Sequence, residues 1–430
     1  MMLRHQLWAF AGLVLFVLSA VHPLQAQISP ATAAGMGMGN NYTALARGVS
    51  ALSFNPAGLG MPGTPGFGLS LLPVTGRQTL QPIGFSDLVD FEGSLLTESV
   101  KEEWLERISL AGGEAGGFGA DVTPLAFHVG AVGVQFSTLV RGVAGLSPDA
   151  AELLLYGNSG RTGAPGDFDL QGSDLSGLAV STVALGFGHR VPVQGGVAGG
   201  TLALGGTLKY SVGHALVLAR DLGSQVQGDP LQVSLDFPMI VSDTSDIDPN
   251  HGSGVGLDLG AAWEKGPWGV GLTVENLFHS FEWDLAGMHF IPGEALFNED
   301  LSESDFDVRP ADQAPGALRD LVSDLRFRPR LSLGGAYRAT EDLTVSGDLR
   351  KRFGDGIEVG PELHAGLGLE YRALSFLPLR LGAAKITDGF QLGGGMTVIL
   401  GPVRLGWAGA LQRGDVEGTM ASFSLSFQGG

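Results

Sequence analysis

The chain contains no cysteine, and charged residues make up only 16% of its 430 positions. Without cysteine there can be no disulfide, no cysteine-ligated zinc or iron–sulfur site and no cysteine nucleophile. Basic residues are also scarce: 25 Lys and Arg stand against 44 Asp and Glu, which gives a formal net charge of −19. A nucleic-acid binder needs a basic face that displaces counterions from phosphates, so the charge balance argues against nucleic acid as a partner.

Long apolar runs are equally scarce after the first 26 residues. No stretch of about 18 apolar residues follows, so we expect no transmembrane helix in the remainder. What the chain has in excess is glycine, 69 residues, in a sequence that is 44% hydrophobic. The glycines follow no strict three-residue period, which excludes collagen, and the apolar content is too high for a disordered chain.

The first 26 residues have the pattern of a cleaved secretory signal. Arg4 and His5 precede an apolar run from Leu7 to about Val21, and Ala26 supplies the small residue at the cleavage position. A membrane anchor is the alternative, but the run is shorter than the roughly 20 residues that a spanning helix needs. We therefore predict that residues 1–26 direct export of the chain and are removed.

Apolar and polar residues alternate along most of the chain after about residue 120, which is the pattern of strands with one apolar face. Near the C-terminus, for example, Phe423, Leu425 and Phe427 alternate with polar residues. A soluble sandwich and a transmembrane barrel both produce this pattern. Strand segments of about 10–12 residues, the export signal and aromatic residues near strand ends favour the barrel.

The predicted fold class is therefore all-β, a transmembrane antiparallel β-barrel of about 14 strands with small helical insertions. Sixteen segments qualify as strands, and bacterial barrels have even strand numbers, so we expect one or two of the early segments to lie outside the wall. The segments are 66–74, 122–129, 131–141, 178–190, 201–213, 230–238, 254–264, 267–277, 281–290, 327–339, 342–353, 361–373, 378–387, 390–400, 402–412 and 417–428. We assign residues 63–430 to the barrel, with long loops at about 75–120, 142–176, 221–252 and 291–326.

A family resemblance begins near the predicted N-terminus of the mature chain. Residues 34–48 (AGMGMGNNYTALARG) and 55–59 (NPAGL) resemble the start of FadL-type outer-membrane barrels. The PorV-type barrels of type IX secretion are similar there, and again at 256–263 and 271–277. An uncharacterised relative of these barrels is similar in overall layout, at 96–101, 153–158 and 378–382.

The resemblance implies a 14-stranded barrel whose N-terminal segment, residues 27–62, folds into the lumen as a plug, or hatch. In the transporter family this hatch moves to open a path for an apolar ligand. The composition agrees, because small residues let a backbone approach the barrel wall closely. A simple cap on the periplasmic mouth is the alternative. The plug motif consists of Gly39, Asn40, Asn55, Pro56 and Ala57.

Charged residues recur on the polar face of the strands in the C-terminal half, where we expect them to face the lumen. They are Asp258, Glu275, Arg330, Arg338, Asp348, Arg350, Glu362, His364, Glu370, Arg372, Arg380 and Arg404. We favour a cross-strand network that fills and stiffens the barrel, since opposite charges on neighbouring strands stabilise by about 0.2–1 kcal/mol per pair. A passage that attracts anions or carboxylates is the alternative, because arginine suits carboxylates.

Catalytic, cofactor and metal motifs are missing from the sequence. The pattern Asp246-x-Asp248-x-Asn250 begins like a calcium loop, but the sixth position is His251 instead of glycine. The chain contains no HExxH, G-x-S-x-G, P-loop or complete dinucleotide fingerprint. We therefore expect no enzyme activity, no cofactor and no metal, and a barrel-embedded hydrolase is a remote alternative.

The function we expect is transport of a small apolar compound across a Gram-negative-type outer membrane. The partners would then be outer-membrane lipid and a small hydrophobic ligand, and a continuous, partly apolar pocket should lie between plug and wall. The alternative is a PorV-type secretion or surface-assembly component that binds protein cargo and secretion-system proteins. That alternative predicts a tightly filled lumen and apolar patches on the outer loops, around residues 290–297.

Overall fold

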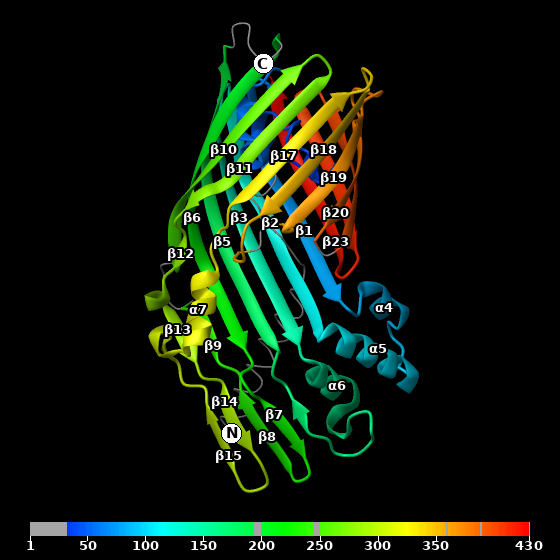
Figure 1. The fold of residues 1–430 in the computed structure, drawn as a ribbon, viewed down its shortest axis with the longest axis vertical. Helices are drawn as coiled ribbons and strands as arrows, with labels where there is room; N and C mark the ends of the chain where they lie inside the picture. The colour runs from blue at the N-terminus through cyan, green and yellow to red at the C-terminus, as the bar shows by residue number, and fades with distance from the viewer. Residues whose placement is uncertain (1–31, 193–198, 244–249, 358–359, 388, 430) are drawn as a thin grey trace.

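The computed structural model describes residues 32–192, 199–243, 250–357, 360–387 and 389–429. Fourteen long strands form a closed antiparallel barrel in which each strand pairs with its neighbours and β1 also pairs with β23 (Figure 1). This confirms the predicted fold class. The strands are β1 (Phe67–Gln81), β2 (Glu114–Val129), β3 (Val132–Leu146), β5 (Asp174–Val191), β6 (Thr201–Arg220), β10 (Gly252–Lys265), β11 (Trp268–His279), β17 (Arg330–Arg338), β18 (Leu343–Arg352), β19 (Leu363–Tyr371), β20 (Leu379–Ile386), β21 (Gly389–Leu400), β22 (Val403–Arg413) and β23 (Glu417–Gly429).

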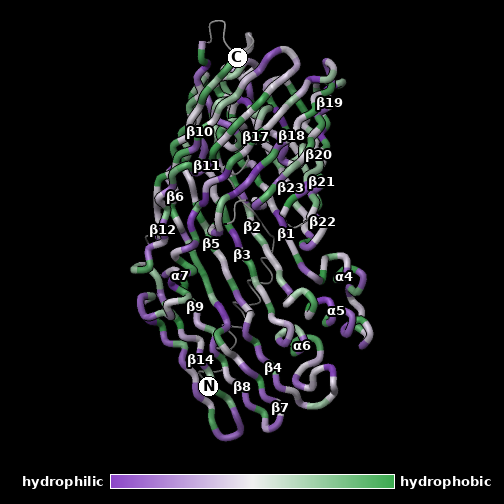
Figure 2. The backbone as a smooth tube through the Cα atoms, in the orientation of Figure 1, coloured by the Kyte–Doolittle hydropathy of each residue, from purple (hydrophilic) through white to green (hydrophobic). Residues whose placement is uncertain are grey.

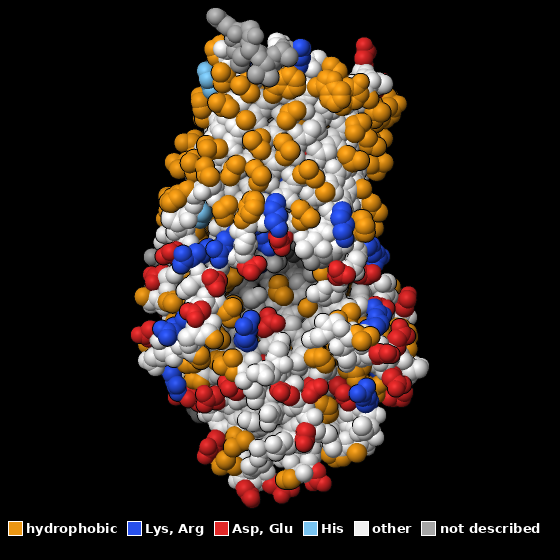
Figure 3. All heavy atoms as spheres, in the orientation of Figure 1, with side chains coloured by type: hydrophobic (Ala, Val, Ile, Leu, Met, Phe, Trp, Pro, Cys, Tyr) orange, Lys and Arg blue, Asp and Glu red, His pale blue; other side chains and the backbone are white. Residues whose placement is uncertain are grey.

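The period of two in the sequence becomes an inside and an outside face of the barrel wall. Along β17 and β20 buried residues alternate with exposed ones, and the exposed positions include Leu333, Leu367 on β19 and Leu381. Figure 2 shows hydrophobic and hydrophilic residues alternating along the strands in the upper part, and Figure 3 shows apolar side chains spread over the same surface. Such an apolar belt is stable in contact with lipid, and the polar groups of the wall then face the lumen.

The two ends of the barrel differ in the length of their connections. At one end, two-residue turns join β2 to β3, β10 to β11 and β21 to β22, with Gly130, Gly266 and Gly401 at positive φ. At the other end, long connections carry α4 (Phe85–Asp90), α5 (Glu98–Ala111) and α6 (Pro148–Tyr156). Short turns normally face the periplasm and long loops the outside, so the end with the two-residue turns is called the periplasmic end. None of the described helices is long and apolar enough to cross a bilayer.

The outer connections build a second, five-stranded sheet that stands beyond the barrel (Figure 1). Its strands follow the order β15 (Ser302–Asp305), β14 (Glu294–Phe297), β8 (Leu231–Asp236), β7 (Gln225–Gly228) and β4 (Phe168–Asp169). In Figure 3 this lower part of the molecule displays many acidic side chains.

Two of the sixteen predicted strands are not wall strands, and both lie in the middle of the chain, which corrects the expectation that the surplus is early. Segment 230–238 contributes β8 to the second sheet. Segment 281–290 splits into β12 (Glu282–Trp283) and β13 (Met288–Ile291), because Phe281, Trp283 and Phe290 turn into an apolar cluster with Ile240 and helix α7 (Gly316–Asp324). Alternation reports a strand with one buried face but does not say which sheet buries it.

Some predicted features lie outside the described residues. They are the signal at 1–26, the first residues of the segment 27–62, and the aspartates 246 and 248 of the acidic loop.

Candidate functional site

Residues 33–61, here called the inner segment, run inside the periplasmic half of the barrel, where Figure 1 shows them in dark blue. The segment contains four short turns of helix: α2 (Ala34–Gly37), η1 (Gly48–Ser50), α3 (Ala51–Phe54) and η2 (Pro56–Gly60). Almost all of it is buried. Helices this short have little stability of their own, so the segment depends on the wall around it.

Glycines on the inward face of the wall let the inner segment approach it. A Cβ at Gly205 would overlap the backbone of Pro56 and Ala57, and a Cβ at Gly382 would overlap Met38. The same holds around much of the circumference, so we call these glycines the glycine collar. Its members are Gly188, Gly205, Gly260, Gly271, Gly334, Gly368, Gly382, Gly393 and Gly395. The excess of glycine in the composition is thus used in part to seat one backbone against another.

The predicted plug motif fixes both ends of the inner segment. The side chain of Asn55 accepts a hydrogen bond from the backbone N–H of Ala57 (3.1 Å) and donates one to the carbonyl of Ala261 on β10 (3.0 Å). Pro56 begins η2, where a missing N–H costs nothing. Gly39 and Asn40 have φ of +60° and +65°, and this left-handed pair turns the chain after α2.

Asn41, which the sequence did not single out, makes the side-chain contacts on that side. Its amide donates to the carbonyl of Met38 (2.8 Å), and its Oδ1 lies 3.0 Å from Nε2 of His364. The only signal in the sequence was its position next to Asn40, since a second asparagine in a turn often bonds to nearby backbone.

Asp348 on β18 holds the inner segment to the wall through one carboxylate oxygen. Its Oδ2 accepts hydrogen bonds from the backbone N–H groups of Tyr42 (3.0 Å) and Thr43 (3.1 Å) and from the Thr43 hydroxyl (2.7 Å). The same oxygen accepts from Arg350 at 2.7 Å. Hydrogen bonds to a charged acceptor are roughly twice as strong as neutral ones, so this residue is a main anchor of the segment.

The predicted lumenal charges do not form one network. Asp258 pairs with Lys209 at 2.6 Å, a cation that the sequence analysis missed, and Glu275 pairs with Arg330. A third group, near the periplasmic rim, joins Glu370 to Arg380 and Arg372, each at 2.7 Å.

The remaining predicted charges lie at the rims or take other partners. Arg338 is 58% exposed and lies 3.7 Å from Glu264, while Glu362 pairs with Lys351 at the outer end. Arg404 is half-buried on β22. His364 is buried, and its ring bonds to Asn41 as described above.

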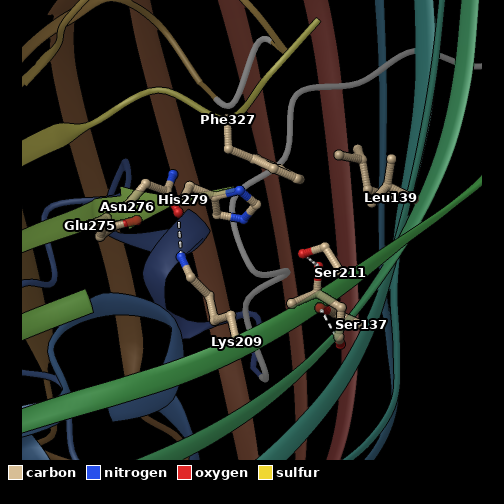
Figure 4. A pocket seen from close by; sticks show the side chains of 10 residues that line it. Ser137, Leu139, Lys209, Ser211, Glu275, Asn276, His279 and Phe327 are labelled. Atoms are coloured by element: carbon tan, nitrogen blue, oxygen red, sulfur yellow. Dashed lines mark hydrogen bonds between the residues drawn. The ribbon is translucent and has the colours of Figure 1, made fainter. Parts of the chain in front are cut away.

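Two small cavities lie in the lumen, where the transporter hypothesis predicts one continuous pocket between the plug and the wall. The outer cavity, of about 30 Å³, is lined by Leu139, Val180 and Phe327 on one side and by Lys209 and Glu275 on the other (Figure 4). Figure 4 shows Lys209 pointing toward Asn276 and the ring of His279 beside Phe327, with 4.5 Å between ring centroids.

The inner cavity, of about 70 Å³, lies between the inner segment and the wall. It is lined by Arg77, Arg330 and Arg350 and by Met36 and Asn40 of the inner segment. The ion pair Glu275–Arg330 separates the two cavities, because each partner lines a different one. Each of these two cavities has room for water molecules but not for a drug-sized ligand.

Serine hydroxyls in the outer cavity are engaged within the wall. Ser211 lies 2.8 Å from the hydroxyl of Thr182, and Ser137 donates to the carbonyl of Thr182 (3.5 Å). The Nδ1 of His279 accepts from the N–H of Phe281 (3.0 Å). The described residues hold no group of three or more His, Asp or Glu side chains that could bind a metal ion.

The outer helices are latched by an ion pair. Arg107 on α5 donates to both carboxylate oxygens of Asp87 on α4 (2.8 and 2.9 Å) and to the carbonyl of Pro82. The hydrogen bonds from Arg107 lower the pKa of Asp87 below its usual value.

The apolar patch that the secretion alternative predicts around residues 290–297 is only partly exposed. Phe290 is buried in the apolar cluster, whereas Phe297 is 37% exposed.

Together, the described residues form a closed antiparallel β-barrel of fourteen strands with an apolar outer belt and a buried N-terminal segment inside it. The chain belongs to the family described as "F plasmid transfer operon, TraF, protein", whose model matches residues 98–349, more than half of the chain. No curated protein matches the chain.

Several solved structures share the fold at low sequence identity. The Ralstonia pickettii toluene transporter TbuX is 14% identical, with a TM-score of 0.52 over 94% of this chain and 99% of that chain. A TodX deltaS2S3 mutant, titled a monoaromatic hydrocarbon channel, is 14% identical with a TM-score of 0.54 over 92% and 97%. A Pseudomonas aeruginosa FadL homologue is 12% identical with a TM-score of 0.50 over 94% and 100%. At identities this low, the structural likeness shows a shared fold and nothing further.

Proposed function

We propose that this protein conducts small apolar compounds across the outer membrane and that residues 27–62 act as its movable hatch. The observation that carries the proposal is the seating of the inner segment. Backbone contacts with the glycine collar and hydrogen bonds to Asp348 and Ala261 hold the segment in place. All of these contacts are non-covalent and can break and re-form. Because the remaining cavities are small, a solute can pass only if this segment moves.

An apolar route from outside supports the same function. The apolar cluster at the outer mouth contains Leu139 and Val180, with Phe327 packed against it, and these three residues also line the outer cavity. The cluster and the outer cavity thus share three apolar side chains, which give an apolar solute a contact surface where it enters the lumen. Two structural neighbours, a toluene transporter and a monoaromatic hydrocarbon channel, suggest the size of such a solute.

Solute flux into liposomes tests the proposal. We expect no swelling in small sugars with the full mature chain and clear swelling after deletion of residues 33–61. Gly334→Leu should give intermediate swelling, because a side chain there would meet Thr43 and Ala44 of the inner segment. Gly335→Leu is the matched control, since that position opens onto free space on the other face of the same strand.

The result that would refute the hatch is equal and negligible flux from the deletion and the intact protein. A lumen that stays closed without the inner segment would be closed by its own side chains. Delivery of toluene into liposomes that contain an entrapped dye is a second measurement on the same proteins. We expect toluene delivery only from protein whose inner segment can move.

The family description favours a second candidate function, a part in plasmid transfer. Its test is the mating frequency of a donor strain from which the gene has been deleted. A large drop in mating with unchanged toluene uptake would favour this candidate over the channel.

A further inference from the structure

A hollow far larger than either lumenal cavity lies on the outside of the barrel wall. It is an open groove of about 860 Å³ that crosses β20, β21, β22, β23 and β1, which are neighbours in the barrel (Figure 1). Every lining residue on the outward face of these strands carries an apolar side chain or none. Because the groove is part of the apolar belt, its occupant must be an apolar group at membrane depth.

The floor of the groove is a row of residues with little or no side chain. Direct partners across β21, β22, β23 and β1 form this row, namely Gly394, Gly409, Ala421 and Gly76. A Cβ at Gly76 would meet nothing within 4 Å, and at Gly394 and Gly409 the nearest atoms would lie at 3.6 and 3.7 Å, an ordinary contact distance. Packing within the chain therefore does not require glycine here, in contrast to the glycine collar, and the floor leaves a space open toward the outside.

Large apolar side chains border the floor on both sides. Two residues nearer the periplasmic end, a ridge of side chains that are between 38% and 44% exposed consists of Leu379, Met396, Trp407, Phe423 and Val74. The rings of Trp407 and Phe423 lie 5.7 Å apart between centroids. Two residues nearer the outer end, the direct partners Leu392 and Leu411 form the opposite ridge. The groove is therefore a trough between two ridges.

The length and direction of the floor match one hydrocarbon chain of a lipid. Four neighbouring strands at about 4.8 Å spacing make the floor roughly 14 Å long. One leaflet of a bilayer, half of a hydrocarbon core of about 30 Å, has nearly the same thickness. Because barrel strands tilt by about 35–45°, a groove that runs across the strands is itself tilted and passes through membrane depth.

A positive charge lies where the head group of such a lipid would be. Lys385, Phe390 and Arg413 are direct partners across β20, β21 and β22, four residues nearer the outer end than the floor. Four residues of a tilted strand bring this row roughly 10 Å closer to the outer surface. The Nζ of Lys385 lies 4.7 Å from the centroid of the Phe390 ring, and Arg413 pairs with Glu417. The described charges of the row therefore leave one positive charge, that of Lys385.

We propose that this groove is a lipid site, in which one acyl chain of a phosphate-bearing lipid of the outer leaflet lies along the floor and its phosphate lies at Lys385. The groove is continuous with the lipid-facing belt, and the cation beyond its outer ridge complements a phosphate. The site faces lipid and not the lumen, so the proposal goes beyond the conduction of a solute and does not depend on it.

Native mass spectrometry of the full mature chain in detergent tests the site, with dipalmitoyl phosphatidylglycerol as the added lipid. We expect one lipid to stay bound to each barrel. Gly409→Leu fills the floor without a clash and should retain at least fivefold less lipid. Gly335→Leu is the matched control, because Gly335 is an outward glycine of β17 that lies outside the groove, and it should retain lipid like the wild type. Equal retention by the two variants would overturn the proposal.

Melting temperatures guard against a variant that is merely damaged. A ligand that binds only the folded state raises its melting temperature. Added lipid should therefore raise the melting temperature of the wild type and of Gly335→Leu but not that of Gly409→Leu. Gly394→Leu, at the next position of the same floor, should repeat the result. An equal rise in all of these proteins would overturn the proposal.

The contact with phosphate is tested through charge. Lys385→Gln should lower the retention of phosphatidylglycerol severalfold and leave unchanged that of dipalmitoylglycerol, which has the same chains and no phosphate. Lys351→Gln, at the outer end of β18 and outside the groove, is the control and should change neither. Equal retention of the two lipids by the wild type, or displacement of the lipid by inorganic phosphate alone, would overturn the proposal.

A second copy of the chain is the other occupant that could cover the groove, and the same spectra detect it. A lipid-bearing monomer supports the proposal. A lipid-free dimer that disappears in Gly409→Leu would overturn it and assign the groove to self-association. Toluene delivery tests the proposed function separately, because none of these variants alters the inner segment or its contacts.

Discussion

The two halves of the lumen are built on opposite principles. The periplasmic half contains the glycine collar, nine positions at which the wall carries no side chain and the inner segment supplies the filling. The half beyond it is lined by long charged side chains such as Arg77, Arg330 and Arg350, and two cavities remain. Backbone packed against backbone leaves little space, whereas the long charged side chains leave two small cavities between them.

Asp348 connects these halves, and its removal should have the largest effect. Asp348→Ala deletes the acceptor of Tyr42 and Thr43 and leaves the buried guanidinium of Arg350 without its partner. Breaking a buried pair from one side costs about 3–5 kcal/mol. We expect a large drop in the melting temperature, measured by circular dichroism in detergent, together with leakage of sugars through the barrel.

The control for this change is Asp342→Ala, an exposed position at the other end of β18. It should leave both melting temperature and leakage unchanged. If the two variants behave alike, Asp348 does not hold the inner segment.

The glycine collar should give the next largest effect. Gly334→Leu forces a side chain against Thr43 and Ala44, and overpacking of this kind costs about 1–3 kcal/mol. Gly335→Leu, on the other face of β17, should be neutral or slightly favourable in lipid. The melting temperatures of the two variants test this prediction. A lowered melting temperature in Gly335→Leu would show that strand β17 does not tolerate leucine on either face, so that the collar is not the cause.

The Asn55 contact should matter less. Asn55→Ala removes the cap on η2 and the hydrogen bond to Ala261, at a cost of about 0.5–2 kcal/mol. We expect faster proteolysis of the inner segment with the wall intact, followed on denaturing gels. Asn158→Ala, in an exposed outer turn, is the matched control and should cleave at the wild-type rate.

The latch between the outer helices should have the smallest effect, and it lies outside both halves of the lumen. Because Arg107 lowers the pKa of Asp87 in the folded state, the pair contributes its stability above the unfolded pKa of about 3.9 and loses it as the pH falls through the lower, folded value. Partly exposed pairs are worth up to about 1 kcal/mol. Fluorescence of Trp104, which packs edge-on against Phe91, should shift on acidification and do so already at neutral pH in Asp87→Asn. A neutral-pH spectrum of that variant identical to wild type would exclude the latch.

Much of the wall was predictable because strand alternation is a local property. An apolar residue next to a polar one, such as Leu331 and Ser332, already indicates which side chain faces lipid and which faces the lumen. Counting the alternating segments gave sixteen candidates for a barrel of about fourteen strands. The count exceeded the wall by two because Phe281 and Phe290 are buried by loop elements far away in the chain. Nothing local distinguishes a strand buried by lipid from one buried by a loop.

The sequence predicted that the lumenal charges face inward, but it could not predict which of them pair with one another. Alternation places Glu275 and Arg330 inside, but their pairing requires β11 and β17 to be neighbours across about fifty residues of outer loop. Lys209 was missed because the predicted charges were drawn from the strands of the C-terminal half, which its strand precedes. Asn41 was missed because the resemblance drew attention to Asn40, which the structure uses for backbone conformation.

By itself the sequence determined the class of the fold, the side of the wall on which each strand residue lies and the excess of glycine that a tightly filled barrel needs. The tertiary structure alone decided which glycines face the inner segment, which carboxylate holds it and which lumenal charges become neighbours. The physical reason is that alternation and composition act over a few residues, whereas barrel closure brings together residues such as Thr43 and Asp348 that lie 305 positions apart.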